Sequence, residues 1–238
     1  MTGASRGLGR ELALALAREG YDLLVCARGA ADLEAVREEI MGVGGKCQVF
    51  PEDLTTSQVI ELSIESNPVE VLVNNAAFAP ALKRLEDLTA DDYYQTFSLN
   101  VYVPFRLMQA AVHGMKMRGS GTIVNICSLS GRRAIRNASL YCASKFALRG
   151  MTEAVAQELE GSGVLCFSCS PGGMDTSMRE GIFHDAAQQQ DPALVAKIIV
   201  DAIAGRVLVP QGGDLVIRGG EYSAVPRERW TGITMEHE

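Results

Sequence analysis

The chain opens with the stretch Thr2-Gly3-Ala4-Ser5-Arg6-Gly7-Leu8-Gly9, and a helical pattern follows at once over residues 8–19. Glycines in such a turn allow the backbone to approach a phosphate closely. The N-terminus of the following helix offers free N–H groups and the positive end of its dipole, and both favour an anion. The stretch therefore predicts a pyrophosphate-binding turn, with an ordinary glycine turn before a helix as the alternative.

Short apolar runs alternate with helical stretches along the rest of the chain. The apolar runs are nearly continuous, as in parallel strands that are covered on both faces. We expect strands at about 22–27, 69–77, 121–128, 163–170 and 214–218, and helices at about 8–19, 31–41, 90–118, 140–160 and 192–204. This alternation predicts an α/β fold with a doubly wound parallel sheet, in a single domain over residues 1–238.

Composition and charge exclude several classes of protein. Of the 238 residues, 47% are hydrophobic and 21% charged, which excludes a disordered chain, and the net charge of −7 argues against a general nucleic-acid binder. No apolar run reaches the length of a membrane span and no leader pattern is visible, so we expect a cytoplasmic protein. The six cysteines and three histidines are scattered, which predicts reduced thiols and no metal site.

Two arginines near the glycine turn bear on the choice of dinucleotide. The strand expected at 22–27 ends without an acidic residue, and Arg28 follows it. In dinucleotide-binding folds an acid at this point binds the ribose 2′-OH, whereas an arginine suits a 2′-phosphate. Arg6 adds a second guanidinium inside the turn. We therefore expect NADP(H) rather than NAD(H), unless both arginines are simply solvated.

Tyr141 and Lys145 lie four residues apart in an expected helix, so they share a face. A free tyrosine titrates near pH 10, and a neighbouring ammonium favours the phenolate, so we expect Lys145 to lower the pKa of Tyr141. Ser128 ends an expected strand at the carboxyl edge of the sheet, where α/β proteins bind ligands. These residues predict proton transfer to or from a carbonyl oxygen.

Taken in order, these motifs resemble the short-chain dehydrogenase/reductase family, in its compact single-domain branch. The resemblance runs from Thr2 to about Thr176. It rests on TGASRGLG at 2–9, PEDL with Asp53, NNAA at 74–77, the set Asn100, Ser128, Tyr141 and Lys145, and PGGMDT at 171–176. Ala77 replaces the last glycine of the family's NNAG, so we expect an altered loop if that position needs a positive φ.

The resemblance implies a Rossmann-type fold and hydride transfer between NADP(H) and a carbonyl or secondary-alcohol substrate. The resemblance implies that Tyr141 is the general acid or base, and that Lys145 lowers its pKa and binds the nicotinamide ribose. It also implies that Ser128 binds the substrate oxygen and that Asn100 places a water beside Lys145. Asp53 contacts the adenine amino group. The implied cofactor contacts are Gly3, Ser5, Arg6, Gly7, Leu8, Gly9, Arg28, Asp53, Leu54, Asn75, Ala76, Tyr141, Lys145, Pro171, Gly172, Met174 and Thr176.

The resemblance also implies a homodimer or homotetramer that packs through the helices at about 101–118 and 140–160. Two other functions remain open on the sequence. One is a 3-oxoacyl-thioester reductase of the acyl-carrier-protein type, although the chain lacks the VxGG ending of many such enzymes. The other is a catalytically idle, nucleotide-binding regulatory protein.

The chain departs from the family before its glycine turn. Family members carry an apolar strand there, whereas Met1 directly precedes Thr2. That strand is central in the topology, so we expect its absence to leave backbone groups of its neighbours unpaired. A misassigned start or a truncated chain would explain the departure.

Two further segments bear on the substrate. Arg132, Arg133 and Arg136 follow Ser128 and are expected either to hold an anionic substrate or acidic carrier, or to form a solvated loop. The variable lid is expected at about 177–191. Its candidate apolar lining residues are Met178, Ile182 and Phe183.

Overall fold

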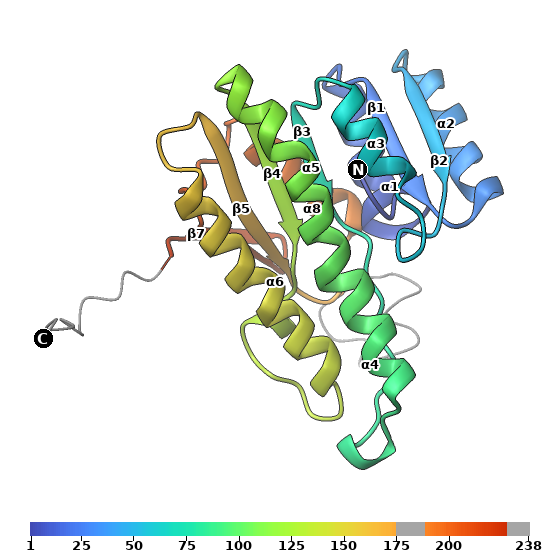
Figure 1. Cartoon of the computed structure of the whole chain (residues 1–238), viewed down its shortest axis with the longest axis vertical. Coiled ribbons are helices and arrows are strands. Elements are labelled where there is room, and N and C mark those ends of the chain that lie inside the picture. The colour runs from blue at the N-terminus through green and yellow to red at the C-terminus, as the bar shows by residue number, and fades with distance from the viewer. Residues whose placement is uncertain (175–188, 228–238) are drawn as a thin grey trace, which may run out of the picture.

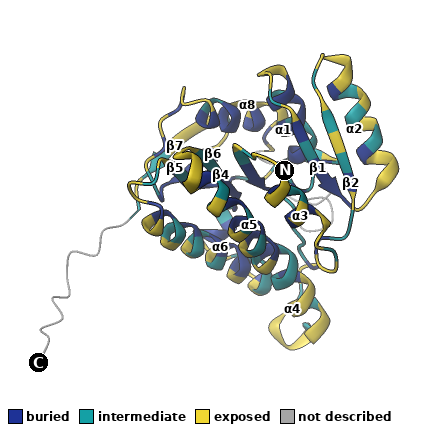
Figure 2. Cartoon of the chain, turned by 45° about the horizontal axis from the view of Figure 1, so that its top comes forward, coloured by how far each residue is buried: buried dark blue, intermediate teal, exposed yellow. Residues whose placement is uncertain are grey.

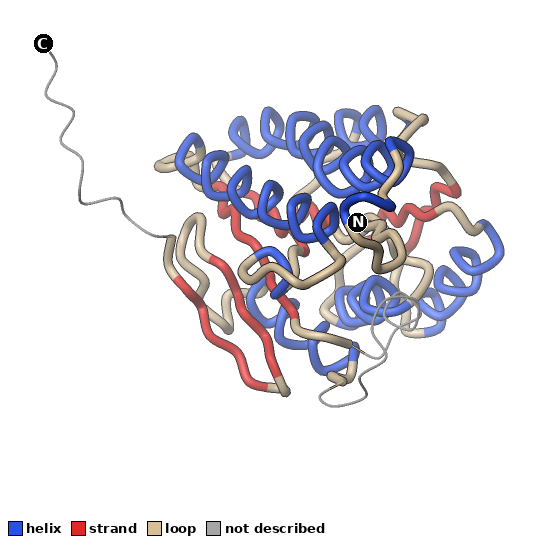
Figure 3. The backbone as a smooth tube through the Cα atoms, turned by 90° about the horizontal axis from the view of Figure 1, so that it is seen from below, coloured by secondary structure: helices blue, strands red, loops and turns tan. Residues whose placement is uncertain are grey.

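The structure is a computed structural model that describes residues 1–174 and 189–227. Parallel strands run through its centre, with helices on both sides of them (Figure 1, Figure 3). β1 pairs with β2 in one part of the sheet, and β3, β4, β5, β6 and β7 pair in that order in the other. The strands are β1 (Leu23–Ala27), β2 (Cys47–Pro51), β3 (Val71–Asn74), β4 (Gly121–Ile126), β5 (Val164–Pro171), β6 (Asp214–Arg218) and β7 (Glu221–Val225).

Two helical layers cover the two faces of the sheet. Apolar side chains of α1, α2 and α8 form one core cluster with the strands, and those of α3 and α5, with the C-terminal end of α6, form the other. Figure 2 shows the buried residues on the strands and the inner helix faces. The helices are α1 (Gly7–Arg18), α2 (Ala30–Gly42), α3 (Val59–Ser66), α4 (Ala90–Phe97), α5 (Val103–Arg118), α6 (Ser139–Glu158) and α8 (Pro192–Ile203). This is the expected doubly wound α/β fold.

The first three residues lie between the two parts of the sheet. The Cys26 amide donates to the Met1 carbonyl oxygen at 3.0 Å, and the Gly3 amide donates to the Cys26 oxygen at 2.8 Å. On the other side, the Thr2 amide donates to the Val73 oxygen at 3.1 Å. Among the described residues no further strand lies between β1 and β3. The glycine turn therefore begins at the carboxyl ends of two neighbouring strands.

Most expected elements are present, with shifted ends, and four features were not expected. Three of them are whole elements, namely β2, β7 and the short helix α3. β2 and β7 consist largely of exposed or half-buried residues. β7 runs antiparallel to β6 after a turn at Gly219 and Gly220, which both have positive φ. The expected helix over 90–118 is interrupted by a π-helical turn at Ser98–Tyr102. Such turns are frequent at functional sites.

The cysteines are free wherever the structure describes them. Cys166 packs into the core cluster on the side of α3 and α5, whereas Cys169 packs into the cluster on the side of α1 and α8. The two thiols therefore lie on opposite faces of β5, as their spacing predicts. The described part of the chain contains no group of potential metal ligands. It also contains no helix with the length and apolar character needed to span a membrane.

Candidate active site

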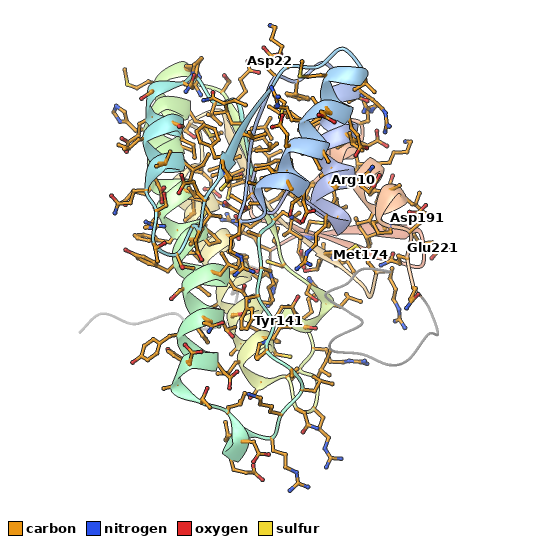
Figure 4. The ribbon with its side chains drawn as sticks, turned by 90° about the vertical axis from the view of Figure 1, so that its right-hand side faces the viewer. Arg10, Asp22, Tyr141, Met174, Asp191 and Glu221 are labelled. Atoms are coloured by element: carbon orange, nitrogen blue, oxygen red, sulfur yellow. The ribbon has the colours of Figure 1, made fainter. Side chains whose placement is uncertain are left out.

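A cavity of about 1060 Å³ opens at the carboxyl ends of the parallel strands. The glycine turn, the ends of β1 to β5 and the start of α6 line it. Tyr141 and Met174, both in its lining, lie at this end of the sheet in Figure 4. Parallel α/β sheets bind ligands at this edge.

The structure brings nearly all the predicted site residues together in this one cavity. Its lining includes Gly3, Ser5, Arg6, Gly7, Leu8, Gly9, Arg28, Asp53, Leu54, Asn75, Ala76, Ser128, Tyr141, Lys145, Pro171, Gly172 and Met174. Asn100 is not in the lining. Thr176, most of the expected lid at 177–191, and Met178, Ile182 and Phe183 lie outside the described residues.

The glycine turn has a shape that only glycine permits at key points. Gly3 and Gly7 have φ of 67° and 53°, in the left-handed region, and a Cβ on Gly9 would lie 1.9 Å from the Gly3 oxygen. α1 begins at Gly7, and no side chain caps its N-terminus. Its first N–H groups are thus available to an anion beside the cavity.

Hydrogen bonds with the two residues after β3 hold the glycine turn in place. The Thr2 hydroxyl accepts hydrogen bonds from the Asn75 and Ala76 amides, both at 3.0 Å. The Asn75 side chain donates to the Thr2 and Gly3 oxygens, both at 3.1 Å. Sequence reasoning missed this role of Thr2, although Thr2 belongs to the TG pair. Ala77 lines the cavity without a positive φ, so its replacement of glycine leaves no strained backbone.

The charged residues at the β1 and β2 end of the cavity are of both signs. Arg6 and Arg28 are exposed and line it, as expected. Asp53 accepts hydrogen bonds from the Thr55 amide (2.9 Å) and hydroxyl (2.7 Å), which lower the pKa of its carboxyl. Asp32 and Glu52 also line this end, and sequence reasoning missed both. Glu52 adjoins Asp53, and Asp32 lies in the first turn of α2.

An arginine of α5 holds the loop after β2. Arg106 Nη2 donates to the Leu54 carbonyl oxygen and lies 3.1 Å from Glu61 Oε1 on α3. The two side chains are only 12% and 11% exposed, and the guanidinium also stacks over the Tyr102 ring. This nearly buried ion pair fixes the backbone beside Asp53 and Leu54 in the cavity wall.

Lys145 and Tyr141 sit together, but their pKa shifts differ from the expectation. Burial raises the pKa of Tyr141 to about 12, against the opposing effect of a hydrogen bond with Ser128. Burial also lowers the pKa of Lys145 to about 8. The Lys145 ammonium donates to the Ile126 oxygen at 2.8 Å and lies 5.8 Å from the Tyr141 ring centre. The prediction that Lys145 lowers the pKa of Tyr141 is therefore wrong for the structure without a bound ligand, because the effect of burial dominates.

Asn100 lies outside the cavity lining but bonds to a residue that belongs to it. It lies fully buried within the π-helical turn. Its side-chain oxygen accepts from the Phe78 amide at 2.7 Å, and its nitrogen donates to the Phe78 oxygen at 2.8 Å and to Ser144 Oγ at 2.9 Å. The Ser144 hydroxyl in turn donates to the main-chain carbonyl oxygen of Tyr141 at 2.8 Å. Asn100 thus ties a cavity-lining loop to the helical turn that carries Tyr141 and Lys145.

The three arginines after Ser128 separate into different environments. Arg132 Nη1 pairs with the buried Asp214 carboxylate at 2.6 Å, and Ser168 donates to the same carboxylate at 2.8 Å. The expectation that Arg132 holds substrate is therefore wrong, because its charge is already matched. Arg133 lines the cavity, and Arg136 is exposed outside the lining.

Comparisons with known proteins agree with this site. Residues 1–187 match the family described as short chain dehydrogenase. The chain is 34% identical over 205 residues to a 3beta-hydroxysteroid dehydrogenase of Mediterraneibacter gnavus, covering 81% of this chain and 74% of that one. It is 31% identical to an NADPH-dependent aldehyde reductase-like protein of Arabidopsis thaliana, covering 93% of this chain and 88% of that one.

A solved structure with the same fold adds to these matches. The structure of a short-chain dehydrogenase from Sphingobium yanoikuyae in complex with NADPH superposes with a TM-score of 0.82 at 26% identity, covering 88% of this chain and 85% of that one. The family match spans most of the chain, and the predicted site residues line one cavity. This chain therefore belongs to the short-chain dehydrogenase/reductase family.

Proposed function

We propose that this chain is an NADP(H)-dependent oxidoreductase that interconverts a carbonyl compound and a secondary or primary alcohol. One observation carries the proposal: Tyr141, Lys145 and Ser128 lie on the wall of the cavity that also contains the glycine turn. An acid–base group and a dinucleotide turn in one cavity are the parts that hydride transfer to a carbonyl requires.

The residues present fit NADP(H). The turn of Gly3, Gly7 and Gly9 and the uncapped start of α1 would hold the pyrophosphate. Arg6 and Arg28 would bind the 2′-phosphate, and Asp53 would bind the adenine amino group. Proteins similar to this chain have names that include NADPH, which supports the same preference. The preference for NADP(H) over NAD(H) thus rests on two guanidiniums facing the cavity.

The other predicted contacts divide between the two ends of the cofactor. Tyr141 and Lys145 would bind the nicotinamide ribose. Main-chain and side-chain groups along the remaining lining would enclose the adenosine and nicotinamide, namely Ser5, Leu8, Leu54, Asn75, Ala76, Pro171, Gly172 and Met174. When bound, the nicotinamide supplies a hydride to the carbonyl carbon or accepts one from the alcohol.

The chain's own residues would complete the reaction by handling the proton. In reduction, the Tyr141 hydroxyl gives its proton to the carbonyl oxygen as that oxygen gains negative charge. The Ser128 hydroxyl donates a hydrogen bond to the same oxygen. Lys145 holds positive charge near the tyrosinate that remains, and solvent then returns the proton. Hydride and proton together account for the two electrons and two hydrogens of the reduction.

The test is oxidation of NADPH by the purified chain with a panel of aldehydes, ketones and one 3-oxoacyl thioester. We expect turnover with at least one of them, and a loss of 100-fold or more in Tyr141→Phe, on the order of the contribution of a general acid. Tyr222→Phe, on exposed β7, is the matched control. Undiminished turnover in Tyr141→Phe would remove Tyr141 from the mechanism. Binding of NADPH without any turnover would favour the catalytically idle alternative.

We also propose that the chain forms a homodimer or homotetramer through α5 and α6. Exposed aromatic side chains at these helices support this: Tyr102 and Phe105 at the start of α5 and Phe146 on α6. Light scattering of the purified chain tests the assembly. Phe105→Glu should shift the mass towards the monomer, whereas a monomeric wild type would contradict the proposal.

A further inference from the structure

The cavity has two ends of different electrostatic character. Its carboxylates come from the end formed by β1, β2 and α2. The rest of the lining, which includes Tyr141, mixes apolar with uncharged polar side chains, and its charged members in the described chain are Lys145 and Arg133. The apolar lining residues there are Phe78, Leu99, Ile135 and Met174. Among the described residues, the end of the cavity that would receive substrate therefore has apolar surface and positive charge but no carboxylate.

Unlike the nearby Arg132 and Arg149, Arg133 has no side-chain partner among the described residues, and unlike Arg136 it lines the cavity. Arg132 is paired with Asp214. Arg149 lies 2.8 Å from Glu153 and donates to the Gly131 oxygen at 3.2 Å. The Arg133 side chain makes no hydrogen bond or ion pair with any residue that the structure describes, while its backbone amide donates to the Leu129 oxygen at 3.0 Å. Its backbone is thus fixed, and its guanidinium is open to a ligand.

The loop that carries Arg133 is anchored at both sides of it. Ser128 Oγ accepts from the Ser130 amide at 3.1 Å, and the Ile135 amide donates to Cys142 Sγ at 3.3 Å. The Arg132–Asp214 ion pair fastens the neighbouring residue to β6. A guanidinium on a fixed loop loses less freedom on pairing with an anion than one on a free chain.

We propose that Arg133 is the specificity-determining residue of this site and selects carbonyl substrates that carry a carboxylate or another anionic group beyond an apolar body. The inference rests on the proposed function. The planar guanidinium binds a carboxylate through two parallel hydrogen bonds. The apolar members of the same lining, among them Phe78, Leu99 and Ile135, suit the body that joins the two polar ends. Because the whole chain has a net charge of −7, attraction of an anion here is local to the cavity.

The experiment compares matched substrates that differ only in charge. The probes are 4-carboxybenzaldehyde and a series of unbranched ω-oxo acids of increasing length, each paired with its methyl ester, all with saturating NADPH. For wild type we expect kcat/KM to favour the acid over its ester for at least one length, mainly through KM. In Arg133→Gln the acid-to-ester ratio for that pair should fall about tenfold, as expected for the loss of one charge-assisted pair.

A charge reversal and a matched control make the result independent of folding. Arg133→Glu should favour 4-(trimethylammonio)benzaldehyde over 4-carboxybenzaldehyde, a gain that a misfolded variant could not produce. Arg136→Gln removes the same charge from the same loop outside the cavity lining, and its ratio should equal that of wild type. Equal efficiency of wild type with acid and ester at every length, or an unchanged ratio in Arg133→Gln, overturns the inference. Failure of the proposed function looks different, because then neither acid nor ester is reduced.

Discussion

Lys145 Nζ donates a 2.8 Å hydrogen bond to the main-chain oxygen of Ile126, at the end of β4. Lys145 is only 2% exposed, so this bond fixes a nearly buried ammonium between α6 and the sheet. Two residues further along, Ser128 follows the same strand and lines the same cavity. The residues proposed to handle the proton are therefore positioned by the end of one strand and by one turn of α6, and the glycine turn lines the same cavity.

Burial of the Lys145 ammonium should reduce the stability of the fold at neutral pH. Its pKa falls from 10.5 in the unfolded chain to about 8. Between pH 8 and 10.5 the Lys145 side chain is protonated in the unfolded chain but mostly neutral in the folded one. The free energy of unfolding of the wild type therefore increases as the pH rises through this range. Lys145→Met should therefore be more stable than wild type at pH 7, by about 2 kcal/mol after the lost hydrogen bond is deducted, and the difference should shrink towards pH 10.

Urea denaturation of both proteins across this pH range checks that expectation. Lys116→Met, which removes an exposed lysine of α5, should show a small and pH-independent difference. If Lys145→Met is the less stable protein at pH 7, the hydrogen bond to Ile126 outweighs the burial of charge.

The nearly buried Arg106–Glu61 pair should matter for both stability and cofactor binding. Arg106→Leu leaves Glu61 without its partner and releases the Leu54 carbonyl in the cavity wall. We expect the free energy of unfolding to fall by about 3 kcal/mol or more and the KM for NADPH to rise. The double variant Arg106→Leu/Glu61→Leu should recover much of the stability but not the KM.

Urea denaturation and NADPH kinetics separate these two effects. Lys46→Ala breaks the exposed Lys46–Asp22 pair and should cost less than about 1 kcal/mol. An unchanged KM in Arg106→Leu would show that the Leu54 backbone does not depend on Arg106.

Asn100 is expected to be a positioning residue, because its side chain bonds to Phe78 and Ser144 behind the cavity wall. Asn100→Leu leaves both main-chain groups of the half-buried Phe78 without their partner, which should lower the free energy of unfolding by about 2 kcal/mol. It should lower kcat more than it raises the KM for NADPH, because the Tyr141 turn moves while the glycine turn stays. Asn67→Ala, which removes an exposed amide of the same kind, should change neither. A variant with normal kcat would exclude this role.

Arg28 should account for much of the choice between the two dinucleotides. Arg28→Glu places a carboxylate where the 2′-phosphate is expected, so KM for NADPH should rise at least tenfold while KM for NADH changes little. Arg18→Glu makes the same change in net charge on an exposed position of α1 outside the cofactor cavity. Equal effects of the two variants on NADPH would mean that only the overall charge matters.

The fold could be predicted from the sequence where strands are buried on both faces. β4 and β5 are mostly apolar over their whole length, so their composition itself indicates that they are buried on both faces. β2 and β7 lie partly in solvent and α3 is only 8 residues long, so none of them carries a strong pattern. The π-helical turn at Ser98–Tyr102 lies inside the stretch expected as one helix over 90–118, and it differs from an α-helix in its hydrogen bonding.

The candidate site could be predicted as far as residue types at strand ends allowed. The sequence could not predict which arginine faces the cavity, because the Arg132–Asp214 pair joins residues 82 positions apart in the chain. The direction of the Tyr141 pKa shift was also beyond the sequence, since it depends on burial. Spacing shows that two side chains share a helix face but not how much water reaches them.

The most direct test of the account is thermal melting of the 238-residue chain with NADPH and NADH titrated separately. A ligand that binds only the folded state raises the melting temperature as its concentration increases. We expect a larger rise with NADPH than with NADH at every concentration. We also expect loss of the rise in Gly9→Val, whose side chain would collide with the Gly3 oxygen. A cooperative melt that neither dinucleotide shifts would contradict the central claim that this cavity binds NADP(H).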